Sequence, residues 1–176
     1  MRMIKPVSDT GELNVIIETP RGSNLKYDYE PELRLFRLAK ALPAGMHFPY
    51  DFGFIPGTLG EDGDPLDILV LSPHPIAVGA LIPVKLIGVL EAEQTEKGSK
   101  KSIRNDRLIG CLLSEAGDED AAFSNAKELP RKLVDEIEAF FVQYNRLEGK
   151  QFQLKGWHGP KRAASLLEAG IEKHKH

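Results

Sequence analysis

The stretch EDGDPLDILV, residues 61–70, sets three aspartates within six residues and then continues into a run of apolar residues that ends at Leu71. Carboxylates as close as Asp62, Asp64 and Asp67 repel one another, so a cation or several hydrogen bonds must compensate their charge. The apolar run predicts a buried strand that holds the acidic loop in place. Oxygen donors without a cysteine or histidine pair nearby favour magnesium, manganese or calcium over zinc. The stretch therefore predicts a site for a divalent metal.

Two other interpretations of this loop were weighed against the metal site. A calcium-binding EF-hand is excluded, because its sixth position would be Asp67 instead of glycine and its twelfth would be Pro73 instead of glutamate. A solvated acidic turn stays open, because aspartate and glycine are both common in turns. Asp67 and the strand behind it favour the metal site over the turn.

Length and composition set further bounds. The chain has 176 residues, 41% of them hydrophobic and 28% charged, which predicts a single domain over residues 1–176 with a substantial core. A net charge of −3 argues against a nucleic-acid-binding or anionic-membrane-binding protein, which needs a basic face. The lone Cys111 predicts a small core residue. With no signal peptide and no apolar stretch of spanning length visible, a cytoplasmic location is expected.

The remaining pattern predicts an α+β fold that is mainly β. Short apolar or alternating runs bounded by Gly and Pro predict strands at 13–18, 24–29, 33–38, 53–55, 68–71, 81–90 and 107–113, as in a small antiparallel barrel. Apolar residues then recur at helical spacing between Pro130 and Gly149, which predicts a helix ending at Leu147. A second helix is expected from Pro160 through Ile171, followed by a frayed polar tail.

With residues 62–67 as its core, the sequence resembles the soluble family I inorganic pyrophosphatases of bacterial type. Supporting matches follow in the expected order at 16–20, 25–27, 48–55, 88–90, 140–144 and 156–157. The resemblance implies an OB-like five-stranded β-barrel flanked by C-terminal helices. It also implies hydrolysis of inorganic pyrophosphate to two phosphates, a requirement for Mg²⁺ and a homo-hexamer.

The residue types also suit that chemistry by themselves. Pyrophosphate is a compact polyanion, and two divalent ions about 3.5 to 4 Å apart can neutralise it and make a nucleophile from water. By motif position, Asp62 and Asp67 resemble the metal ligands, Asp64 the carboxylate that receives the proton of the water, and Glu18 a further acid lining the cavity. The positions that resemble phosphate contacts are Lys26, Lys40, Tyr144 and Lys150.

Three of these residues also have an ordinary structural interpretation. Tyr144 shares the apolar face of the predicted helix with Ile137 and Phe141, so on the pattern alone simple packing is favoured roughly two to one. Lys26 alternates with apolar neighbours on a predicted strand, as an outward, solvated lysine would. Glu18 stands at the predicted end of a strand, where an exposed acid is common.

Several positions depart from the family pattern. Lys40 stands where an arginine is usual, which replaces a planar fork by a point charge and predicts weaker positioning of phosphate. The other departures are Phe48 and Phe52 at tyrosine positions, Asn145 at a lysine position and Asp28 at a glutamate position.

Residues 91–107 are longer than the family's acidic loop, which carries two metal aspartates and a lysine. Arg107 is the predicted counterpart of that lysine. Asp106 is preferred to Asn105 as a metal ligand, because only a carboxylate supplies an anionic oxygen, and Glu93 is a weaker candidate for the other ligand. A basic cluster that restores lost positive charge is one hypothesis for this loop, and a solvated hairpin tip is an equal alternative. The cluster comprises Lys100, Lys101, Arg104 and Arg107.

Two functions compete with pyrophosphate hydrolysis. Altered phosphate contacts could shift specificity to a nucleoside triphosphate or polyphosphate. An OB-like barrel can also serve as a binding module without catalysis, although such a surface needs basic residues interleaved with stacking aromatics, and here the densest motif is acidic.

Overall fold

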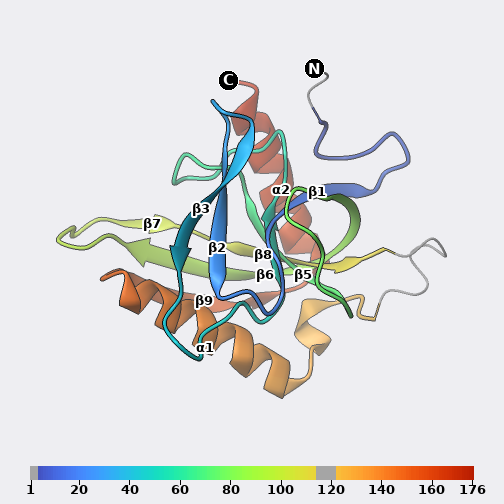
Figure 1. The fold of residues 1–176 in the computed structure, drawn as a ribbon. Helices are drawn as coiled ribbons and strands as arrows, with labels where there is room; N and C mark the ends of the chain where they lie inside the picture. The colour runs from blue at the N-terminus through green and yellow to red at the C-terminus, as the bar shows by residue number, and fades with distance from the viewer. Residues whose placement is uncertain (1–3, 114–121) are drawn as a thin grey trace.

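A closed ring of five strands forms the centre of this computed structural model, which describes residues 4–113 and 122–176 (Figure 1). Around the ring, β1 pairs with β4, β4 with β5, β5 with β8, β8 with β6, and β6 again with β1. The strands are β1 Leu13–Thr19, β2 Leu25–Glu30, β3 Leu35–Ala41, β4 Asp51–Phe54, β5 Asp67–Leu71, β6 Leu81–Thr95, β7 Ser102–Arg104, β8 Arg107–Leu112 and β9 Gln151–His158. The helices are η2 Ala126–Glu128, α1 Arg131–Leu147 and α2 Pro160–His174. The expected five-stranded barrel is confirmed.

Three features of the sheet differ from the sequence prediction. The pairing of β5 with β8 is parallel, whereas an all-antiparallel barrel was expected. Strands β2 and β3 form a separate hairpin outside the ring. Strand β6 continues past residue 90 and pairs there with β7 and β9, two strands that were not predicted. Their sequences carry many polar residues, so they lack the apolar run by which the other strands were recognised.

Two hydrophobic layers flank the ring. One joins β4, β5, β6 and β8 to α1 through side chains such as Phe52, Leu69 and Phe141. The other joins the opposite faces of the same strands to α2 through side chains such as Ile68 and Leu167. Strand β5 is therefore buried on both faces, which explains why its sequence is continuously apolar instead of alternating. In Figure 1, α1 lies along β9 on one side of the barrel and α2 lies on another.

The helices match the sequence prediction closely. Helix α1 ends at Leu147 as expected, and α2 begins at Pro160 but continues to His174, beyond the predicted end. No described helix is long and apolar enough to cross a membrane.

The acidic loop is anchored by this arrangement. Asp67 opens β5 and lies in register with Phe54 of β4. Just before it, the carbonyl of Leu66 accepts a hydrogen bond from the Ile55 N–H at 3.0 Å, and the Leu66 N–H donates to the Thr58 hydroxyl at 3.0 Å. The Asp62 carboxylate accepts from the Asp64 N–H at 3.1 Å. The loop is thus tied to a strand that is buried on both sides.

Candidate active site

A cavity of about 600 Å³ lies between the acidic loop, the β2–β3 hairpin and α1. Seven carboxylates and three cations line it, a net charge of −4 when all are ionised. The carboxylates are Glu18, Asp28, Asp62, Asp64, Asp67, Glu96 and Glu148, and the cations are Lys26, Arg107 and Lys150. Such an acidic cavity requires added cations before it can accept a polyanion.

Three carboxylates of the cavity are partly or fully shielded from water. Burial raises the pKa of Asp67 to about 6, an effect that the guanidinium of Arg107 reduces and Asp62 strengthens. Burial raises the pKa of Glu18 to about 7, although its carboxylate accepts a hydrogen bond from the Tyr29 N–H at 2.8 Å. Partial loss of hydration, together with neighbouring Asp62, also raises the pKa of Asp64. A bound cation would stabilise the ionised form of all three acids.

Arg107 is the cation nearest to the acidic loop. Its Nη1 lies 2.7 Å from Oδ2 of Asp67, and the same nitrogen donates to the side-chain oxygen of Asn105. Its guanidinium also stands over the ring of Phe141, 5.2 Å from the centroid. Arg107 and Asp67 begin the neighbouring strands β8 and β5, whose parallel pairing brings the two ends together.

The predicted lysines each face a carboxylate. Lys26 pairs with Asp28 on the same face of β2, and Lys40 of β3 pairs with Glu148, just past the end of α1. Lys150 lies 3.3 Å from Glu96 and 3.8 Å from Glu148. Lys40 does not itself line the cavity, but it lies beside Tyr144, which does. The cations are therefore held near the cavity by acids that a phosphate group could replace.

Tyr144 both packs against other aromatic rings and lines the cavity. Its ring stacks on Phe140 with centroids 5.7 Å apart and also contacts Phe48 at 6.0 Å. It also lines the cavity, and burial raises the pKa of its hydroxyl, which therefore remains protonated. Packing and substrate contact are compatible at this position.

A family model described as inorganic pyrophosphatase matches residues 15–175. The chain belongs to the inorganic pyrophosphatase family. Among its relatives in that family, the inorganic pyrophosphatases of Thermus thermophilus and Rickettsia bellii are 36% and 37% identical to it, each over 97% of this chain and 95% of the relative. A crystal structure of the Thermus thermophilus inorganic pyrophosphatase matches with a TM-score of 0.87 and 34% identity, over 99% of this chain and 98% of that one.

The side chains that line this cavity are chemically suited to bind a hard divalent cation. Its acids supply carboxylate oxygens, the ligands that Mg²⁺ prefers. Within residues 4–113 and 122–176, however, no three His, Cys, Asp or Glu side chains stand close enough together to hold an ion as they are. One oxygen of Asp67 is engaged by Arg107. The acidic loop must therefore rearrange its side chains around an incoming cation.

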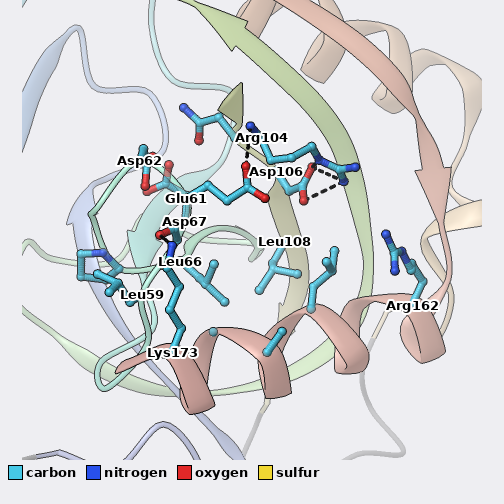
Figure 2. Close-up of a pocket in the computed structure, with 16 residues that line it drawn as sticks. Leu59, Glu61, Asp62, Leu66, Asp67, Arg104, Asp106, Leu108, Arg162 and Lys173 are labelled. Atoms are coloured by element: carbon cyan, nitrogen blue, oxygen red, sulfur yellow. Dashed lines mark hydrogen bonds and ion pairs between the residues drawn. The ribbon is translucent and has the colours of Figure 1, made fainter. Parts of the chain in front are cut away.

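Two predicted metal ligands lie outside the cavity of this pyrophosphatase-family fold. Asp106 lines a neighbouring pocket of about 300 Å³, where it accepts hydrogen bonds from Arg104 at 2.8 and 2.9 Å (Figure 2). Its Oδ1 also accepts from the Ala92 N–H at 3.0 Å. Glu93 is paired with Lys155 at 2.9 Å and lines neither pocket. Asp62 and Asp67 of the acidic loop also line this neighbouring pocket, so Asp106 shares it with them, although the described carboxylates are not close enough to hold an ion as they are. Glu93 lies apart from the loop.

The four side chains of the proposed basic cluster do not lie together. Arg107 lines the cavity, whereas Arg104 turns to the neighbouring pocket and pairs with Glu91 at 3.1 Å and with Asp106. Lys100 and Lys101 line neither of these pockets. Figure 2 shows the side chain of Arg104 lying against Asp106, with Arg162 of α2 on the far side of the pocket.

Sequence reasoning missed several lining residues. Glu148 pairs with two lysines from distant segments, and it follows Tyr144 by four residues at the end of α1. That helical spacing was a signal that could have placed it near the cavity. Glu96 and Gln94 lie at the end of β6 and reach the cavity only because β6 extends beyond its apolar half. No sequence pattern indicated that extension.

Proposed function

We propose that this protein hydrolyses inorganic pyrophosphate to two phosphates with Mg²⁺ as cofactor. The observation that carries the proposal is the cavity, in which three aspartates of one loop face cations from three other segments in a chain of the pyrophosphatase family. A small polyanion that arrives with divalent cations matches this distribution of charge. The enzyme would then remove the by-product of nucleotide-dependent biosynthesis, and we place it in the cytoplasm for that reason.

The acidic loop would hold the cations. Asp62 and Asp67 are the proposed ligands, and Asp64 would accept the proton of the attacking water. Divalent cations, when bound, neutralise the substrate and lower the pKa of a water molecule. Asp64 suits its role because it makes no ion pair with a described residue and its pKa is already raised. The rigid strand β5 keeps this base beside the ligands.

The lysines and the tyrosine would bind the phosphates. Lys26 and Lys150, which line the cavity, would each exchange a carboxylate partner for a phosphate oxygen, so each cation is positioned before the substrate arrives. Lys40, beside Tyr144, would reach the phosphate only by leaving Glu148 and turning into the cavity. Tyr144 would donate its hydroxyl proton to a phosphate oxygen as charge gathers on the leaving group. Glu18, beside Asp67 in the cavity, would support the cation site. The metal-ligand roles of Asp106 and Glu93 stay predictions, and this proposal does not depend on them.

The test is release of phosphate from pyrophosphate, compared with ATP and with polyphosphate, in the presence and absence of Mg²⁺. Hydrolysis should depend on Mg²⁺ and favour pyrophosphate. Asp67→Asn should lower kcat/KM by about 100-fold, because it removes one anionic oxygen from the site. Asp135→Asn is the matched control, since Asp135 is an exposed acid of α1 that pairs with Arg131. A preference for ATP or polyphosphate would assign a different phosphoanhydride, and an active Asp67→Asn variant would refute the site.

The assembly that the family resemblance implies is a homo-hexamer, which light scattering after size-exclusion chromatography can measure. A binding module without catalysis is disfavoured by the net charge of the cavity. Retarded migration of single-stranded DNA that survives excess Mg²⁺ and moderate salt would favour that module instead.

A further inference from the structure

Arg107 is the only lysine or arginine among the described residues that is buried, with 6% of its surface exposed. Its guanidinium carbon lies 5.2, 5.5 and 5.8 Å from the ring centroids of Phe141, Phe152 and Phe52. The guanidinium of an arginine carries a positive charge in proteins. The three rings therefore surround a permanent positive charge at the base of the cavity, an arrangement stabilised by cation–π attraction.

The hydrogen bonds of Arg107 are incomplete. Nη1 makes the ion pair with Asp67 and donates to Asn105, whereas Nε is buried and has no partner among the described residues. An unpaired buried donor is unfavourable. The guanidinium is thus placed by aromatic packing and by contacts of Nη1 with the Asp67 carboxylate, with Asn105 and with the Asp106 carbonyl, while Nε stays unpaired among the described residues.

Arg107 and a divalent cation would both use the carboxylate of Asp67. Asp67 is the last acid of the motif and the one fixed most firmly, because it is the first residue of β5. Its Oδ2 is taken by Nη1 at 2.7 Å. A divalent cation that binds Oδ2 must displace the guanidinium, and one that binds Oδ1 lies close to it, where like charges repel one another.

We propose that the guanidinium of Arg107 acts as a counter-ion of the acidic loop, and that divalent cations must compete with it for the carboxylate of Asp67. The inference rests on the proposed function, because it takes the acidic loop as the place where divalent cations bind. The free protein consequently binds them more weakly than its carboxylates alone would. When a cation takes Asp67, the guanidinium is released and becomes available to a phosphate oxygen, so that loading with metal prepares the cavity for its anionic substrate.

The test measures binding of Mn²⁺ alone, by titration calorimetry without substrate. Arg107→Met removes the charge and leaves a flexible apolar chain that can pack among the phenyl rings. This variant should bind Mn²⁺ at least about 10-fold more tightly than the wild type, or bind an additional ion, because the positive charge of Arg107 no longer pairs with Asp67 or repels the incoming cation. Arg131→Met is the matched control, since Arg131 is exposed on α1 and pairs with Asp135 outside the cavity, and its affinity should equal that of the wild type.

A second measurement needs no substitution. In wild-type protein with ¹⁵N-labelled arginine, addition of Mg²⁺ should shift the side-chain NMR signal of Arg107 in a saturable manner and leave that of exposed Arg131 unchanged. Equal or weaker Mn²⁺ affinity in a folded Arg107→Met variant overturns the proposal, as does an unshifted Arg107 signal at saturating Mg²⁺. If the wild type binds no divalent cation at all, the proposed function fails together with this inference. If it binds them but Arg107 has no influence, only the inference fails.

Discussion

The ammonium nitrogen of Lys40 lies 4.4 Å from the centroid of the Tyr144 ring. Lys40 belongs to the hairpin β2–β3 and Tyr144 to α1, so the contact joins the two walls of the cavity. Lys40 also pairs with Glu148, four residues after Tyr144. Lys40 therefore contacts both the ring of Tyr144 and the carboxylate of Glu148, and these contacts connect the hairpin to α1.

Tyr144→Phe separates the two roles of the tyrosine. The phenyl ring keeps its packing on Phe140 and its place under Lys40, so the free energy of unfolding should change by less than about 0.5 kcal/mol. Loss of the hydroxyl should lower kcat/KM for pyrophosphate by about 10- to 100-fold. Tyr50→Phe is the control, because Tyr50 contacts the same core without lining the cavity. Full activity of Tyr144→Phe would reduce Tyr144 to a packing residue.

Lys40→Arg tests the departure from the family pattern. A guanidinium can hold a phosphate through two parallel hydrogen bonds, which an ammonium cannot do. The KM for pyrophosphate should therefore fall by roughly 3- to 10-fold, with kcat little changed. Lys161→Arg, on the exposed start of α2, serves as the control. A higher KM in Lys40→Arg would mean that a lysine is needed at this position for its ion pair with Glu148 and not for binding of phosphate.

Stability should depend on pH through Asp51. This acid is fully buried, its Oδ1 accepts from the N–H groups of Arg21 and Ile76, and its Oδ2 has no partner among the described residues. Burial raises the pKa of Asp51 above its ordinary value of 3.8. Between the unfolded and the folded pKa the folded state binds more protons, so the free energy of unfolding falls as pH rises through this window.

Asp51→Asn removes that dependence, because asparagine stays neutral. Relative to the wild type, the variant should lose less stability between pH 4 and pH 7, measured by urea unfolding at both values. Asp9→Asn, at an exposed ion pair with Lys5, should show no such difference. Parallel stability curves for Asp51→Asn and the wild type would show that Asp51 is not desolvated in solution.

Gly88 marks a point where the barrel admits no side chain. A Cβ there would lie 2.3 Å from the Cβ of Ala126 and 2.4 Å from the carbonyl oxygen of His158. Gly88→Ala should therefore lower the free energy of unfolding by about 2 kcal/mol or more, because a backbone carbonyl cannot move aside cheaply. The double variant with Ala126→Gly should recover only part of this loss, since the clash with His158 remains. Thermal unfolding of both variants measures the difference, and an unaffected Gly88→Ala would contradict the packing described here.

The barrel strands with strong apolar runs, the two C-terminal helices and the acidic motif could all be predicted from the amino-acid sequence. These features depend on local order along the chain: residues 68–71 are continuously apolar because β5 is buried on both faces, and helical spacing from Leu133 to Leu147 is sufficient to define α1. The three aspartates were recognisable for the same reason, since they are neighbours in sequence before they are neighbours in space.

Which charged side chains pair with one another depends on the three-dimensional fold. Arg107 reaches Asp67 because β5 and β8 pair in parallel, and Glu148 reaches Lys40 because α1 ends beside the β2–β3 hairpin. Asp106 precedes Arg107 by one residue, yet it turns to the other pocket and binds Arg104. Successive residues of an extended chain point to opposite sides, so the choice between them depends on the register of strand pairing, which the spacing of residues along the sequence does not contain.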